Sequence, residues 1–145
     1  MTRISFYKIA GDRDLALALI RQLMQKALQA DQTVLCQVEA PDIAQHLDDY
    51  LWRQERSSFI PHAIGPESWP IAISADPLPG EHHQLLINLQ PDIPTWFSRF
   101  ERVIEIIYTD PDYQQSKRNN FRFYKERGYA LDFFDLSDKF TGSKT

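Results

Sequence analysis

The fold class is decided by residues 3–52, which read RISFYKIAGDRDLALALIRQLMQKALQADQTVLCQVEAPDIAQHLDDYLW. Residues 3–9 are rich in β-branched and aromatic side chains and predict a strand. Residues 15–28 place apolar side chains at helical spacing, and a second helix over 41–52 opens on a proline. The nearly all-apolar stretch 33–38 is typical of a buried parallel strand. Strand, helix, strand, helix in this order predicts an α/β fold with a mostly parallel sheet.

The remainder of the chain continues the same pattern. Six further elements are predicted: strands at 70–74, 84–89, 102–108 and 129–134, a short helix at 95–99, and a helix from Asp110 to Gly128. We expect the last strand to lie at the edge of the sheet, and residues 53–70 to form a strand-poor connection. With no internal repeat or linker, the chain predicts one domain over 1–145, frayed from about 137 onward.

Composition excludes several classes of protein. The chain has 145 residues, of which 43% are hydrophobic, enough to bury one sizeable core. Its single cysteine, Cys36, cannot form an internal disulfide. The opening residues 1–8 lack the apolar run of a signal peptide, and no stretch approaches the roughly 18 apolar residues of a membrane span. We therefore expect a cytoplasmic protein with no membrane contact.

The sequence contains neither of the usual phosphate-binding loops. There is no GxxxxGK[ST] motif, and the five glycines do not form a GxGxxG motif. The order of strands and helices predicts a three-layer α/β sandwich that resembles a nucleotide-binding fold. The missing motifs predict that it lacks a phosphate loop. No cofactor is expected.

Single residues with reactive side chains have structural explanations. Cys36 lies in an apolar strand, where a thiol fills the core rather than acting as a nucleophile. His82 and His83 lie in a loop bounded by proline and glycine, without further metal ligands nearby, and we expect that loop to be exposed. His62 follows a proline and is interpreted as a polar cap on a packed loop.

Acidic residues follow two of the predicted strands. Asp12 and Asp14, like Asp110 and Asp112, are positioned to cap a helix and to interact with its dipole. The alternative is a small phosphohydrolase or nucleotide-dependent enzyme that uses Asp12, Asp14 and His62. Neither a catalytic nor a metal site is predicted, because no complete set of residues assembles.

The last predicted helix carries most of the local charge. Residues 114–127 hold five basic residues and one acidic residue, although the whole chain has a net charge of -4. Lys117, Phe121 and Lys125 share one helical stripe, with Arg118 and Arg122 on its flank. Such a surface suits a peptide with acidic residues and an aromatic side chain.

Two other interpretations of this helix stay open. In the first, Phe121 and Tyr124 face the core and the charges are only solvated. In the second, the helix binds single-stranded nucleic acid by stacking bases on Phe121, Tyr113 or Tyr124. The acidic total charge weighs against the second.

Two segments together resemble the chi subunit family of bacterial DNA polymerase III. They are LWRQERSSFIPH at 51–62 and RNNFRFYKERGYAL at 118–131, in the family's order and separation. The strands at 4–7, 34–36 and 85–89 also fit that family in order.

This resemblance implies a non-catalytic adaptor. Chi subunits belong to the clamp-loader assembly of the replicative polymerase, pair with the psi subunit, and contact nucleic acid only indirectly. They bind the acidic C-terminal tail of single-stranded DNA-binding protein, which ends in phenylalanine. The resemblance assigns the tail site to Lys117, Arg118, Phe121, Arg122, Tyr124 and Lys125.

The resemblance also implies a second surface. The family's apolar contact for psi, which a repair helicase also uses, maps onto Trp52 and Phe59, with Pro61 shaping the loop. Two residues depart from the best-known member. Gln114 replaces a basic residue, and Phe121 replaces a tyrosine, so that an aromatic wall is kept without its hydroxyl.

Overall fold

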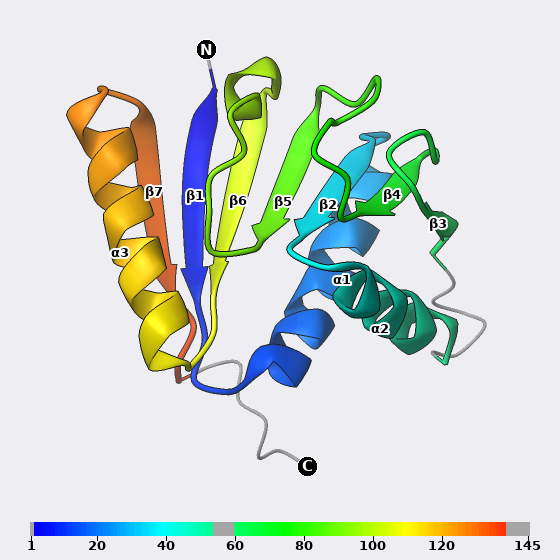
Figure 1. The fold of residues 1–145 in the computed structure, drawn as a ribbon, viewed down its shortest axis with the longest axis horizontal. Coiled ribbons are helices and arrows are strands. Elements are labelled where there is room, and N and C mark those ends of the chain that lie inside the picture. The colour runs from blue at the N-terminus through cyan, green and yellow to red at the C-terminus, as the bar shows by residue number, and fades with distance from the viewer. Residues whose placement is uncertain (1, 54–59, 139–145) are drawn as a thin grey trace.

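One sheet of seven parallel strands organises the described part of the chain (Figure 1). The structure is a computed structural model that describes residues 2–53 and 60–138. The strands are β1 (Arg3–Lys8), β2 (Val34–Val38), β3 (His62–Ile64), β4 (Ile71–Ser74), β5 (Leu85–Leu89), β6 (Arg102–Ile107) and β7 (Ala130–Asp135). Their order across the sheet is β3-β4-β2-β5-β6-β1-β7. This confirms the predicted α/β class and places the last strand at an edge.

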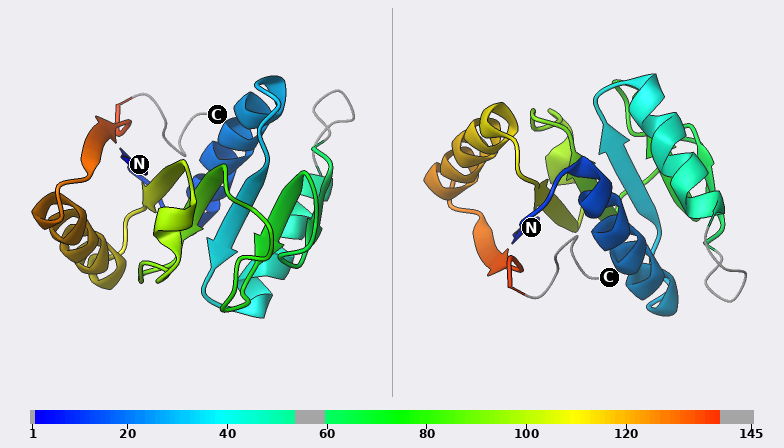
Figure 2. Two further views of the ribbon diagram at one scale, coloured as in Figure 1. Left: turned by 90° about the horizontal axis from the view of Figure 1, so that it is seen from above. Right: turned by 90° about the horizontal axis from the view of Figure 1, so that it is seen from below.

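Three α-helices cover the sheet: α1 (Arg13–Gln29), α2 (Pro41–Trp52) and α3 (Pro111–Glu126). The chain moves one way along the sheet from β1 through β2 to β3, and the other way from β6 to β7. Because crossovers between parallel strands are right-handed, the two directions put helices on opposite faces. Accordingly, α3 stands beside β7 and β1, whereas α1 and α2 lie together toward the other end (Figures 1 and 2). The three-layer prediction is confirmed.

Alternation along the strands divides the core into two layers. On β2, Val34, Cys36 and Val38 pack with α1 and α2, whereas Leu35 packs with the layer that contains α3. Cys36 is fully buried, and burial raises the pKa of its thiol to about 12. Its predicted place in the core is therefore confirmed. No helix in the described residues is long and apolar enough to cross a bilayer.

Two predicted connections differ from the structure. The segment 53–70 contains a short strand, β3, which pairs with β4 from His62↔Ile71 to Ile64↔Ile73. The predicted helix at 95–99 is a single 3₁₀ turn over Phe97–Arg99. At the other end of the chain, the backbone N–H of Ser137 donates to Asp135, and residues 139–145 lie outside the described residues.

The loop that carries His82 and His83 is only half exposed, which corrects the prediction. His83 faces solvent, but His82 is fully buried, with its Nε2 2.8 Å from the Ser68 carbonyl and its ring 4.5 Å from the Trp69 ring. This loop lies so close to the loop that contains Pro66 and Ser68 that a Cβ on Gly80 would lie 2.6 Å from the Pro66 carbonyl oxygen. This loop-on-loop packing buries His82.

Candidate functional site

The carboxyl ends of β1 and β6 form the crevice where sheets of this type hold nucleotides, because the chain leaves them toward opposite faces. A pocket of about 310 Å³ lies there, lined by Asp12, Asp14 and Asp110 among others. Asp12 accepts a hydrogen bond from the Leu15 N–H, and Asp110 from the Tyr113 N–H, both at 3.1 Å. The N-termini of α1 and α3 are therefore capped by the chain's own carboxylates, as predicted. With three acids against one cation, Arg13, the lining of this crevice disfavours a phosphate.

The residues of the enzymatic alternative are not brought together. Asp12 and Asp14 follow β1, which is next to one edge of the sheet, whereas His62 lies on β3 at the other edge. Asp14 pairs with His46 at 3.0 Å, and His62 lies 3.2 Å from Asp48. In residues 2–53 and 60–138, no group of three or more His, Cys, Asp or Glu side chains is placed to hold a metal ion.

A larger pocket, of about 560 Å³, is lined by residues of α3 together with residues of β1, β6 and β7. Five of the residues that line it are basic, and no described residue in its lining is acidic. The basic residues are Lys8, Lys117, Arg118, Arg122 and Lys125. The others are Phe6, Ile107, Gln114, Phe121 and Phe133. An anionic ligand with an apolar part is the chemistry that this lining favours.

Three phenylalanines form the apolar floor of this pocket. The Phe121 ring meets the Phe6 ring edge-on at 5.3 Å and the Phe133 ring edge-on at 6.1 Å. Phe6 and Phe133 stack with their centroids 6.3 Å apart. These separations are typical of favourable aromatic pairs, so the floor is a preformed aromatic surface.

The helix side of the pocket offers cations that the protein itself does not neutralise. Arg118, Arg122 and Lys125 are all exposed. Among the described residues, no ion pair within 4.0 Å involves any of the three; Arg118 donates only to the neutral Gln115, at 2.9 Å. Arg118, Phe121, Arg122 and Lys125 thus share one pocket, as their helical spacing predicts.

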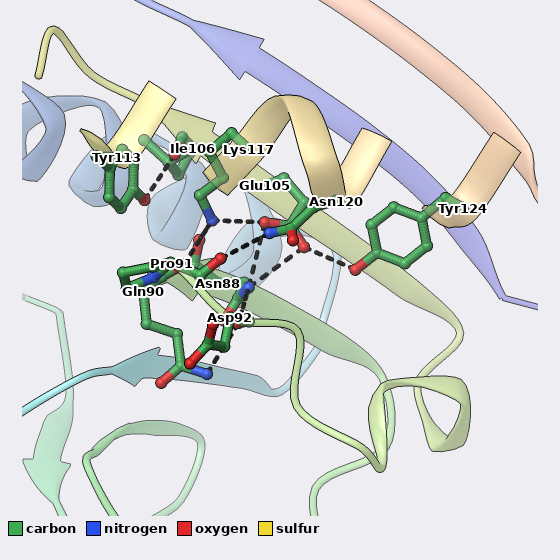
Figure 3. Close-up of polar contacts among 10 residues, drawn as sticks. All are labelled: Asn88, Gln90, Pro91, Asp92, Glu105, Ile106, Tyr113, Lys117, Asn120 and Tyr124. Carbon is green, nitrogen blue, oxygen red and sulfur yellow. Dashed lines mark hydrogen bonds and ion pairs between the residues drawn. The ribbon is translucent and has the colours of Figure 1, made fainter. Parts of the chain in front are cut away.

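Lys117 and Tyr124 face inward, which corrects their predicted place at the ligand surface. Figure 3 shows both directed at Glu105 of β6. The Nζ of Lys117 donates to Glu105 at 2.6 Å, to the Gln90 carbonyl at 2.7 Å and to the Asn88 carbonyl at 3.2 Å. The Tyr124 hydroxyl donates to the other Glu105 oxygen at 2.6 Å. Lys117 still lines the pocket, but its ammonium group is already paired with the Glu105 carboxylate.

This buried polar cluster fixes α3 against the sheet. Burial lowers the pKa of Lys117, an effect that the Glu105 carboxylate opposes, and burial together with Glu105 raises the pKa of Tyr124. Asn88 also donates to both Glu105 oxygens, and Asn120 of α3 donates to the Pro91 carbonyl. The helix that carries the exposed cations is therefore held in one register.

The sheet side of the pocket was not found from the sequence. Phe6 and Lys8 come from β1, Ile107 from the end of β6, and Phe133 from β7. Arg3 to Lys8 pair in register with Ala130 to Asp135, so residues more than a hundred positions apart become neighbours. The alternation of side chains along β1 and β7 could have indicated which residues share a face. Finding the pocket also required knowing that these two strands are neighbours in the sheet.

The second predicted surface lies at the opposite end of the sheet. Trp52 ends α2 with 57% of its surface exposed, and its ring lies 5.0 Å from the His62 ring. Pro61 is also exposed. Phe59 lies outside the described residues.

Comparison with known proteins finds one family. The family model described as DNA polymerase III chi subunit, HolC, matches residues 1–132. DNA polymerase III subunit chi of Pseudomonas aeruginosa is 35% identical over 134 residues, covering 90% of this chain and 94% of that protein. The subunit chi of Haemophilus influenzae is 27% identical over 71% of this chain and 75% of its own length. That of Escherichia coli is 22% identical over 91% of this chain and 97% of its own length.

Proposed function

The chain belongs to the DNA polymerase III chi subunit family, and we propose that it binds the acidic C-terminal tail of single-stranded DNA-binding protein in the pocket along α3. One observation carries the proposal: exposed cations that make no ion pair with any described residue line the same pocket as an aromatic floor. An acidic peptide ending in phenylalanine complements both.

The binding geometry follows from the residue types. The guanidinium groups of Arg118 and Arg122 hold carboxylates through paired N–H donors, and Lys125 adds a point charge. The terminal ring covers the aromatic floor beside Phe121. Among exposed groups, each ionic contact contributes a modest energy that salt screens, so binding is weak and depends on ionic strength.

In this proposal the protein works as a tether and carries out no chemistry of its own. Single-stranded DNA-binding protein coats exposed template, and its flexible tails hold the clamp loader at that location. A contact of micromolar strength, about -8 kcal/mol, is released quickly. Several tails on one coated segment compensate by avidity.

The test is fluorescence anisotropy of a labelled acidic, phenylalanine-terminated peptide at low and at physiological salt. We expect Arg118→Ala and Arg122→Ala each to weaken binding about two- to fivefold, and the wild-type affinity to fall with salt. Arg127→Ala is the matched control, because Arg127 is exposed near the end of the same helix but does not line the pocket. Unchanged affinity in the Arg118/Arg122 double variant would remove the site. Equal binding of a bare oligonucleotide through these residues would instead favour direct nucleic-acid contact.

We further propose that the surface around Trp52 and Pro61 pairs with a psi subunit. An exposed tryptophan at a helix end is the kind of anchor that dominates protein interfaces. In a pull-down with purified psi, we expect Trp52→Ala to abolish capture, while the thermal midpoint stays close to that of the wild type. Phe134→Ala, at the opposite sheet edge with a 42% exposed ring, serves as the control. Full capture by the Trp52 variant would contradict the assignment.

A further inference from the structure

Phe133 and Phe134 are neighbours on the edge strand β7 but face opposite sides of the sheet. Their exposed fractions are similar, at 49% and 42%. Phe133 joins the aromatic floor with Phe6 and Phe121, whereas the Phe134 ring packs 5.1 Å from Tyr7 on the other face. Only Phe133 lines the pocket along α3. A large apolar residue that is about half exposed thus lines a cationic pocket.

Lys8 places a further cation on the sheet side of that pocket. It ends β1, where it pairs in register with Ile107 of β6 and Asp135 of β7. In the described part of the chain, Lys8 makes no ion pair within 4.0 Å, although its charge helps to lower the pKa of Asp135. Lys8 thus adds a positive charge to the sheet wall of the pocket, with the helix arginines on the other wall.

We infer that the sheet supplies half of the peptide site, with Phe133 contacting the terminal aromatic ring of the peptide and Lys8 pairing with one of its carboxylates. This inference rests on the proposed tail-binding function. It assigns to the site two residues that the stripe along α3 does not contain, one from each of the paired strands β1 and β7.

The arrangement of the rings sets the selectivity of the site. Phe6 and Phe121 pack against Phe133 through stacked and edge-on contacts, and Phe133 lines the pocket with 49% of its surface exposed. An aromatic ring gains both apolar burial and a favourable ring-ring geometry there, whereas an aliphatic side chain gains only burial. A peptide ending in phenylalanine is therefore preferred over the same peptide ending in leucine.

A double-mutant cycle on the whole protein tests the role of Phe133. Affinities of the wild type, Phe133→Ala and Phe134→Ala are measured for two acidic peptides, one ending in phenylalanine and one in alanine. We expect Phe133→Ala to weaken binding of the first peptide about fivefold, and to change binding of the second less than twofold. Phe134→Ala changes neither, since it removes an equally exposed ring on the other face. Equal losses for both peptides would overturn the ring contact.

Lys8 is tested by charge removal. We expect Lys8→Gln to weaken binding about two- to fivefold at low salt and to reduce its salt dependence. Lys26→Gln, an exposed lysine in the last turn of α1, is the control. Urea unfolding of each variant verifies that the fold is retained.

The two levels of the proposal fail differently. If Arg118→Ala and Arg122→Ala weaken binding while Phe133→Ala and Lys8→Gln do not, the tail site stands and the sheet-side assignment is wrong. If the helix variants bind as well as the wild type, the proposed function itself is wrong.

Discussion

The ammonium nitrogen of Lys117 lies 2.6 Å from a carboxylate oxygen of Glu105, and neither side chain has any exposed surface. Lys117 nevertheless belongs to the helix whose neighbouring residues, Arg118 and Phe121, line an open pocket. The ion pair joins α3 to β6 of the sheet. Its loss should therefore lower the free energy of unfolding before it affects binding.

Removing one partner of this pair leaves the other charge buried. We expect Lys117→Met to reduce the free energy of unfolding by about 3–5 kcal/mol, because Glu105 then keeps a buried charge without its cation. The double variant Lys117→Met/Glu105→Leu should recover part of this loss, since both charges are absent. Urea unfolding at neutral pH provides the measurement. A double variant less stable than Lys117→Met would show that the pair is not the source.

We expect Tyr124 to contribute to stability and not to peptide binding. Its hydroxyl donates to buried Glu105, so Tyr124→Phe should lower the free energy of unfolding by about 1.5–3 kcal/mol. Peptide affinity, measured by anisotropy well below the unfolding temperature, should stay within twofold of the wild type. Phe121→Ala, which removes part of the aromatic floor, should weaken binding in the same assay. A large loss of affinity in Tyr124→Phe would return this residue to the peptide site.

A cation added at Gln114 should strengthen the pocket. Gln114 lines it beside Arg118 and is uncharged, so Gln114→Lys raises the local positive potential. We expect the acidic peptide to bind about two- to fivefold more tightly at low salt, with a steeper salt dependence. Gln22→Lys, at an exposed position of α1, adds the same net charge elsewhere and should change affinity little. Equal gains in both variants would mean that net charge alone is responsible.

His82 should make the fold sensitive to acid. Burial lowers its pKa, an effect that the hydrogen bond to Ser68 opposes and that nearby His83 reinforces. The unfolded chain, with a histidine pKa of about 6.5, therefore binds the proton more readily than the folded protein. The stabilising contribution is complete above that value and is lost as the pH falls through it toward the folded pKa.

The measurement compares urea unfolding at about pH 7.5 and about pH 5.5. His82→Gln should show a smaller loss of stability between these conditions than the wild type. The exposed neighbour provides the control, since His83→Gln should keep most of the wild-type dependence. Parallel profiles for the wild type and His82→Gln would contradict this assignment.

Most of the architecture was predictable because local sequence and tertiary structure agree. The helix α2 was predicted from Pro41 to about Trp52 by its opening proline and apolar spacing, and β2 by its nearly all-apolar run. The strand β3 was missed because His62–Ile64 is only three residues long and lies between Pro61 and Gly65. Its pairing with β4, rather than its own composition, makes it a strand.

The candidate site was predictable only on its helix side. Helical spacing places Arg118, Phe121 and Arg122 together, but it does not distinguish the buried Lys117 from its exposed neighbours. That distinction depends on Glu105, and the available signal was its charge within the otherwise apolar residues 103–107 of β6. Phe133 joined the site through strand order, which local patterns do not reveal.

The pairing of β1 with β7 gives the proposed site a temporal property. Its walls come from residues 6–8 and 107–133, so a ligand finds both walls only after the residues as far as Phe133 have been synthesised and folded. Until β7 docks, Phe6 and Lys8 lie on an open strand edge. A partly synthesised chain that lacks β7 therefore has only one wall of the proposed site.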